Sequence, residues 1–245
     1  MTTATKPKSG FEKWQEGINH AVGDAKWDIY DCDIQTAVNA FNRHLTGTAG
    51  YFPLDWQLIK AMMWVETGAG SDLWKSNPMQ IGMPGDPGLR ALLSDKEGGG
   101  LILPPSLQSG LNVVSATSMA THNIRAGIGY LLMRIASFEI KSVPDADTRT
   151  YEVTVHAGDS LDKIAKVQGS TIESLKKLNP TAHVLRPGQV LKYQKAAIQK
   201  VIIRWKHLTT SNIAIRYNVG DPLYAKKLDY ALLLMRKGKV MACTP

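Results

Sequence analysis

Glu66 is a single carboxylate at the end of an apolar run. It lies in the stretch Met63-Trp-Val-Glu-Thr-Gly68, with a glycine two residues later. Apolar surroundings disfavour ionisation, so such a carboxyl group can still hold a proton near neutral pH. A proton held there can be donated to a reacting group, which is the task of a general acid. Glu66 is therefore the candidate general acid. The competing interpretation, a salt-bridged residue at a helix end, is less favoured because a negative charge is unfavourable near a helix C-terminus.

No other set of residues indicates a metal or a cofactor. The six histidines show no pair at helical ligand spacing, which a zinc-binding helix would require. Cys32 and Cys243 have neither a ligand spacing nor a paired framework around them. We expect two unpaired thiols, with one disulfide as the alternative. We expect no cofactor and no metal site.

Charge and length set wide limits on function. The chain has 245 residues, enough for one large domain or two unequal ones. Its formal charge is +8, which favours encounters with polyanions such as nucleic acid, anionic lipid or an anionic cell-wall polymer. The first residues lack the apolar run of a signal peptide, and no stretch has the length of a membrane span. We therefore expect synthesis in the cytoplasm without a signal peptide.

Helices must position Glu66. Apolar periodicity predicts helices over 28–44, 55–66 and 123–137. The second of these ends at Glu66, where Thr67 and Gly68 act as the stop signal. The region 82–110 is rich in Gly, Pro, Ser and Asp, so we predict a loop with one short helical piece at 89–93.

The pattern changes after residue 140. The segment 141–150 is polar and is predicted to be a linker. The segment 151–193 then reads strand, helix, helix, strand. Ser160 is placed to cap the first helix, Ser170 or Thr171 the second, and Asn179-Pro180 ends it.

This second segment, YEVTVHAGDSLDKIAKVQGSTIESLKKLNPTAHVLRPGQVLKY, resembles a LysM module almost throughout. The resemblance implies a βααβ fold that binds glycans containing N-acetylglucosamine. It places the glycan contacts in the loop after the first strand and the loop before the second. The implied contact residues are Gly158, Asp159, Ser160, Asn179, Pro180 and Leu185. The apolar positions of the module are more simply explained as a small core.

Four flanking motifs share a second resemblance. In order, VETG, NPMQIG, NIRAGIGYLL and AIRYNVG resemble the successive motifs of the soluble lytic transglycosylase domain. That family implies a lysozyme-like, mainly helical fold that cleaves peptidoglycan. The predicted fold class is therefore α+β, with a helical domain formed by 1–140 and 196–245. The LysM domain, 150–195, is inserted within it.

The second resemblance also implies roles for individual residues. Glu66 is the catalytic acid, and it then acts as the base that activates the C6 hydroxyl group of muramic acid, giving a 1,6-anhydro end. Neither a second carboxylate nor a metal is needed for that chemistry. The implied substrate-binding residues are Thr67, Met79, Gln80, Ile81, Asn123, Tyr217 and Asn218.

Two alternatives remain open at the level of sequence. A lysozyme-like muramidase would use a second carboxylate, for which Asp72 and Asp86 are the candidates. A cell-wall-binding protein without catalytic activity is the other alternative.

The expected partners follow from both resemblances. They are the glycan strands of peptidoglycan, with neither nucleic acid nor a membrane span. The expected site of action is the periplasm or cell wall, reached through phage lysis machinery or an injection apparatus such as a type VI secretion system. A secretion apparatus or an immunity protein would then be a further partner.

Overall fold

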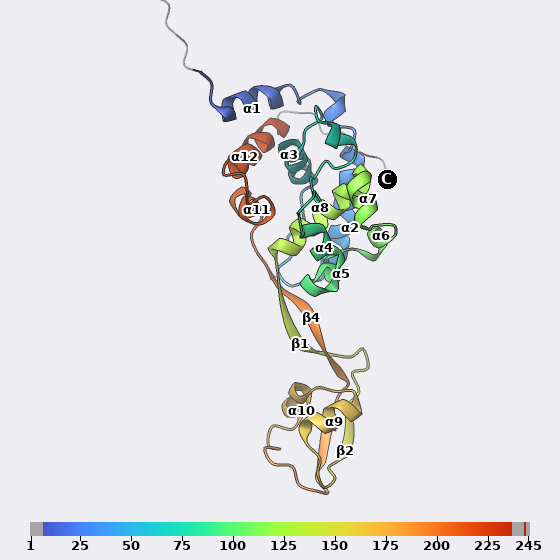
Figure 1. The fold of residues 1–245 in the computed structure, drawn as a ribbon. Helices are drawn as coiled ribbons and strands as arrows, with labels where there is room; N and C mark the ends of the chain where they lie inside the picture. Colours follow the sequence, from blue (N-terminus) through green and yellow to red (C-terminus); the bar gives the residue numbers. More distant parts are fainter. Residues whose placement is uncertain (1–6, 237–242, 244–245) are drawn as a thin grey trace, which may run out of the picture. The chain divides into compact units, whose positions relative to one another are not determined.

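The computed structural model describes residues 7–236 and residue 243. The chain divides into two compact units. The larger unit combines Met1–Ser137 with Ile202–Pro245, and the smaller unit is Phe138–Val201. Helices dominate the larger unit, and the smaller unit combines helices with short strands (Figure 1).

The helices of the larger unit are mostly short. They are α1 (Gly10–Asn19), α2 (Asp31–Leu45), α3 (Trp56–Glu66), α4 (Gly88–Leu93), α5 (Gly99–Ile102), α6 (Pro105–Gln108), α7 (Val113–Ser118), α8 (Ala120–Ile135), α11 (Thr210–Tyr217) and α12 (Tyr224–Met235). Three 3-10 turns, Ala25–Trp27, Asp72–Lys75 and Asp95–Glu97, complete the unit.

Helix α3 is central to this unit. The Asp55 side chain caps its first turn by accepting from the backbone N–H of Gln57 at 2.9 Å. Seven of its residues, Leu58 to Trp64, are buried, because α2 and α12 both pack against it. It ends before Gly68, whose φ of +71° favours glycine and where a Cβ atom would lie 2.7 Å from the Trp27 ring.

Helix α8 forms the second support of the unit. It packs against α2, α4, α5, α7 and α11. Gly127 on this helix allows close approach of the Met79 side chain, since a Cβ atom there would lie 2.7 Å from Met79 Cβ. The chain segment that follows Glu66 is thereby held against α8.

Two predicted irregular segments are regular in the structure. In the predicted loop 82–110, α4 confirms the short helical piece predicted at 89–93, whereas α5 and α6 were not predicted and form because their apolar side chains are buried against neighbouring helices. The predicted linker overlaps β1 (Ala136–Pro144), which pairs with β4 (Ala196–Trp205) in a two-stranded sheet. The composition of both segments predicted irregular structure, because the helices and the strand that stabilise them are distant in sequence.

The expectation of two unpaired thiols was wrong. Cys32 and Cys243 form a disulfide across a sequence separation of 211 residues. Helix α2, which carries Cys32, and helix α12, which precedes Cys243, both pack against α3. The fold therefore brings the end of the chain to α2, which sequence spacing could not indicate.

The smaller unit has the predicted order of elements. It contains β2 (Tyr151–Thr154), α9 (Leu161–Gln168), α10 (Ile172–Leu178) and β3 (Val190–Tyr193). The strands pair antiparallel, with Tyr151 opposite Tyr193. Ser160 caps α9, Thr171 caps α10, and Asn179 ends α10, which confirms those predictions. The core is formed by Val155, Ile164, Ala165, Leu175 and Leu191.

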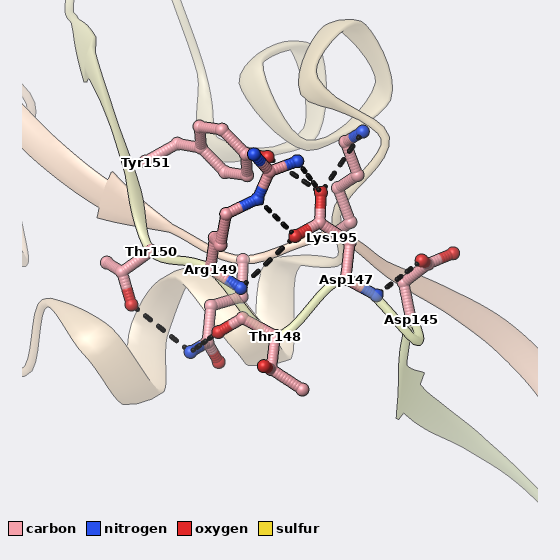
Figure 2. Close-up of polar contacts among 8 residues, drawn as sticks. Asp145, Asp147, Thr148, Arg149, Thr150, Tyr151 and Lys195 are labelled. Carbon is pink, nitrogen blue, oxygen red and sulfur yellow. Dashed lines mark hydrogen bonds and ion pairs between the residues drawn. The ribbon is translucent and has the colours of Figure 1, made fainter.

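A carboxylate clamp closes the open end of the β2–β3 pair (Figure 2). Asp147 accepts from Arg149 Nε at 2.8 Å and from the Tyr151 hydroxyl group at 2.6 Å, and Lys195 Nζ lies 3.6 Å away. The Tyr151 ring also stacks on Tyr193, with centroids 5.3 Å apart. Hydrogen bonds from Arg149 and Tyr151 hold the pKa of Asp147 well below its usual range. The clamp ties the segment before β2 to the residues that follow β3.

Among residues 7–236 and 243, no helix combines the length and apolar character needed to cross a membrane. The same residues contain no group of three His, Cys, Asp or Glu side chains arranged to hold a metal ion.

Candidate functional site

The Glu66 carboxyl group is mostly buried at the end of α3. Burial raises its pKa to about 7, from an ordinary value of 4.5. Hydrogen bonding by Tyr224 and Asn218 opposes this shift, and the nearby charge of Asp221 adds to it. Desolvation is the largest cause, so the carboxyl group retains its proton near neutral pH. This is the protonation state that a general acid requires.

Residues from the end of the chain surround the Glu66 carboxyl group. Asn218 Nδ2 donates to Glu66 Oε1 at 3.4 Å. Tyr224 is fully buried, and its hydroxyl group lies close enough to favour the charged form of Glu66, although no hydrogen bond of regular geometry joins it to a described residue. Asp221 is held by Lys227 at 2.7 Å and by the backbone N–H of Leu223 at 2.8 Å.

The segment 77–82 lies beside Glu66 and is anchored by Asn123. This asparagine is completely buried on α8. Its Oδ1 accepts from the backbone N–H of Met79 at 2.7 Å, and its Nδ2 donates to Asn77 Oδ1 at 2.6 Å and to Ala116 O at 2.8 Å. One amide side chain therefore satisfies groups from two different segments, 77–82 and helix α7.

Further hydrogen bonds fix this segment to α3 and α11. Gln80 Nε2 donates to the backbone carbonyl of Glu66, and Thr67 Oγ1 donates to the carbonyl of Pro78 at 2.9 Å. The Tyr217 hydroxyl group donates to the carbonyl of Met79 at 2.9 Å. Gln80 has a φ of +50°, and no other non-glycine residue in the described part of the chain has a positive φ. A backbone strained in this way persists only where its surroundings hold it.

The predicted substrate-binding residues therefore divide into two groups. Met79, Ile81 and Asn123 are 0 to 2 % exposed, so their side chains support the segment. Their predicted role in substrate binding stays a prediction. Thr67, Gln80, Tyr217 and Asn218 are only partly buried and lie around Glu66 or its backbone.

Asp86, one of the two candidate second carboxylates, has a structural role. It accepts from the backbone N–H groups of Gly82 and Gly88 at 2.9 and 2.7 Å, which closes the turn before α4. Asp72 is exposed at the start of a 3-10 turn. Asp221 is the carboxylate whose charge acts on the pKa of Glu66, and the sequence prediction did not include it.

Tyr224, Asp221 and Lys227 were missed because α12 reads as an amphipathic helix. Its tyrosine and apolar positions are typical of core, and nothing local links them to a residue more than 150 positions earlier. The available signal was the Asp221-Pro222 turn, which directly follows the fourth motif and precedes α12.

The predicted glycan-contact residues lie in two loops of the smaller unit. Gly158 has a φ of +80°, and Asp159 Oδ2 accepts from the backbone N–H of His156 at 2.8 Å. Asn179 exchanges hydrogen bonds with the backbone of Lys192, at 2.7 and 2.9 Å. Ser160 caps α9, Pro180 is exposed, and Leu185 packs on the core. Many of their polar atoms are thus used to shape the loops.

Loss of the Asn123 side chain should destabilise the site and the fold together. We expect Asn123→Leu to lower the free energy of unfolding by about 2–3 kcal/mol, since it leaves buried Met79 N–H and Asn77 without partners. Urea denaturation monitored by circular dichroism measures this. A loss below about 1 kcal/mol would contradict the central role of Asn123.

Comparison with known proteins identifies one part of the chain. Residues 153–193 match the family model of the LysM domain. The chain thus contains a LysM domain, which supports binding to the glycan of peptidoglycan. Searches of the curated proteins and of the solved structures found no match to the chain.

Proposed function

We propose that the protein is a lytic transglycosylase that cleaves the β-1,4 bond between N-acetylmuramic acid and N-acetylglucosamine and leaves 1,6-anhydro ends. The observation that carries this proposal is the raised pKa of Glu66, about 7, in a site bordered by Asn218 and Tyr224. In the proposed mechanism the protonated carboxyl group donates its proton to the leaving oxygen as positive charge develops on the sugar.

The second step uses the same group. After donating its proton, the Glu66 carboxylate accepts the proton of the muramic acid C6 hydroxyl group, whose oxygen attacks C1. The bond from C1 to the leaving oxygen breaks, the bond from C1 to O6 forms, and the proton count of Glu66 is restored. A pKa near ambient pH suits a group that must act in both directions.

The surroundings of Glu66 favour this scheme over hydrolysis with two carboxylates. An inverting or retaining hydrolase needs a second carboxylate free to act on water or on the sugar. Asp86 is engaged by two backbone N–H groups, and Asp221 by Lys227 and Leu223. A muramidase remains the second candidate because Asp221 influences the pKa of Glu66.

The LysM domain and the disulfide support an action on the cell wall outside the cytoplasm. The LysM domain supplies affinity for the polymer, and a disulfide persists in an oxidising compartment. We propose delivery to the periplasm or wall by a phage or injection apparatus, as the sequence led us to expect. A cognate immunity protein belongs to the same proposal.

The products of digestion test the proposal. Purified sacculi are digested with the protein, and the soluble muropeptides are analysed by mass spectrometry with and without borohydride reduction. We expect anhydro-muropeptides, which are 18 Da lighter than the hydrolytic products and resist reduction, because C1 is closed by O6. Reducible ends would identify a muramidase, and no release would identify a glycan-binding protein without catalysis.

A further inference from the structure

Four cationic residues of the larger unit lie close enough for three of them to act electrostatically on the fourth, Lys206. They are Arg134 on α8, Arg204 on β4, Lys206 just after β4, and Arg216 on α11. Lys206 N donates to the backbone carbonyl of Ile135 at 2.9 Å, so Lys206 lies next to the end of α8 that carries Arg134. These four residues are called the basic cluster below.

The backbone of β4 fixes the direction of two members. Trp205 is buried and its Nε1 donates to Thr48 Oγ1 at 3.0 Å, so this side chain points into the unit. Successive side chains of an extended segment point to opposite sides. Arg204 and Lys206 therefore both point away from the core, on the same side.

The basic cluster lacks matching acidic groups. Arg134 Nη1 lies 4.0 Å from Glu97, and both side chains are about half exposed. Within the described part of the chain, no carboxylate makes an ion pair with Arg204, Lys206 or Arg216. Arg216 Nε is buried and has no hydrogen-bond partner among the same residues. A buried donor without a partner is costly, so an anion that accepts a hydrogen bond there would stabilise the cluster.

The lowered pKa of Lys206 reflects its burial and repulsion among the positive charges of the basic cluster. Burial lowers the pKa of Lys206, and the charges of Arg216, Arg134 and Arg204 lower it further. Like charges held together are unfavourable unless an anion neutralises them. Arginine side chains, which present a fork of donors, are especially suited to a carboxylate.

The basic cluster adjoins the candidate site. Arg134 is one turn after Tyr130 on α8 and acts on the pKa of that tyrosine. The Tyr130 ring packs edge-to-face on Tyr217, with centroids 5.6 Å apart. Arg216 directly precedes Tyr217, and Asn218 donates to Glu66. An anion bound at the cluster would thus be attached to the same polymer whose sugar lies at Glu66.

We propose that the basic cluster binds the carboxylates of the peptide stems that peptidoglycan carries on its muramic acid residues. This inference rests on the proposed function for the identity of the polymer. It adds to that function a requirement for peptide-bearing glycan, as distinct from bare glycan.

Binding by a protein that cannot cleave tests this inference. All arms use the Glu66→Gln background. The variant pair Arg204→Glu and Lys206→Glu is compared with the control pair Lys13→Glu and Lys75→Glu, which makes the same charge change at exposed positions. The probes are sacculi of a Gram-negative bacterium, which lack teichoic acid phosphates, and the same sacculi after carbodiimide and excess ammonia have converted the carboxylates of the peptide stems to neutral amides.

We expect the cluster pair to weaken binding to untreated sacculi about tenfold relative to the control pair, and to leave binding to amidated sacculi unchanged. Equal binding by both pairs would overturn the proposal, as would an equal loss on both kinds of sacculi. Should the cluster pair fail to fold, Arg204→Ala with Lys206→Ala replaces it, with Lys13→Ala and Lys75→Ala as control.

A lack of enzyme activity does not affect this readout. If digestion of sacculi gives no anhydro ends but the cluster pair still loses carboxylate-dependent binding, the proposed function fails and the basic cluster stands as a peptide-stem site. If digestion gives anhydro ends and binding is unaffected, only the present inference fails.

Discussion

Glu66→Gln should lower the rate of peptidoglycan cleavage by about 10²-fold to 10⁴-fold, because it removes the transferable proton and keeps the shape of the side chain. The rate is measured as release of soluble muropeptides from purified sacculi. Binding to the glycan should be unchanged, since the LysM domain lies in a separate unit of the structure. Wild-type release by the Gln variant would remove Glu66 from the mechanism.

The stability of the same variant shows whether the loss reflects chemistry or misfolding. The pKa of Glu66 is raised to about 7 in the folded protein. Below the unfolded pKa both states hold the proton, so Glu66 contributes no penalty there. Between the unfolded pKa and the folded pKa, the unfolded chain ionises while the folded protein keeps its proton, so the stability of the folded state falls over this interval, and the loss is complete above the folded pKa. Glu66→Gln should therefore match the wild type at pH 4 and exceed it at pH 9, by at most about 2–3 kcal/mol.

A variant that is less stable than the wild type at pH 9 would contradict the buried, protonated state of Glu66. Gln80→Ala provides a matched control, because it removes an amide that contacts only the backbone carbonyl of Glu66 and leaves the titrating group in place. Its stability difference from the wild type should not change over the interval from about pH 4.5 to about pH 7.

Loss of the Cys32–Cys243 disulfide is expected to have the largest effect on stability. The bridge closes a loop of 211 residues, so its removal should lower the free energy of unfolding by up to about 5 kcal/mol through the entropy of the unfolded chain. The double variant Cys32→Ser and Cys243→Ser is compared with the wild type by urea denaturation under oxidising conditions.

Reductant separates the effect of the bond from the effect of the substitutions. Dithiothreitol should shift the wild-type transition toward that of the double variant and leave the double variant unchanged. If the wild-type midpoint does not respond to reductant, the two cysteines are not joined in solution and the prediction fails.

The smaller unit could be predicted in detail because its signals are local. Ser160 caps the backbone N–H of Lys163, three residues away, and Thr171 does the same for Ser174. Gly158 and Gly188 have φ values of +80° and +86°, which few other residues adopt. Interactions between residues three or four positions apart can be predicted from the sequence alone, because both partners lie within one short motif.

Glu66 could be selected for a related reason. Its apolar neighbours in sequence, Met63 and Trp64, are also its neighbours along a buried helix, so the sequence already indicated a carboxyl group that resists ionisation. The linker prediction failed where strand pairing decided otherwise, because the polar segment after residue 140 begins as a strand.

Tertiary structure alone decided the remaining features. Tyr224 and Asp221 lie near Glu66 only because α12 packs against α3. Cys243 reaches Cys32 because α12, which precedes Cys243, and α2, which carries Cys32, both pack against α3. The basic cluster joins residues from α8, β4 and α11 that are up to 82 positions apart, from Arg134 to Arg216. Contacts between distant segments depend on how whole helices pack, and this information is not contained in the spacing of any one motif. The sequence by itself therefore determined the LysM module and the identity of the candidate acid, whereas packing determined the environment that sets its pKa.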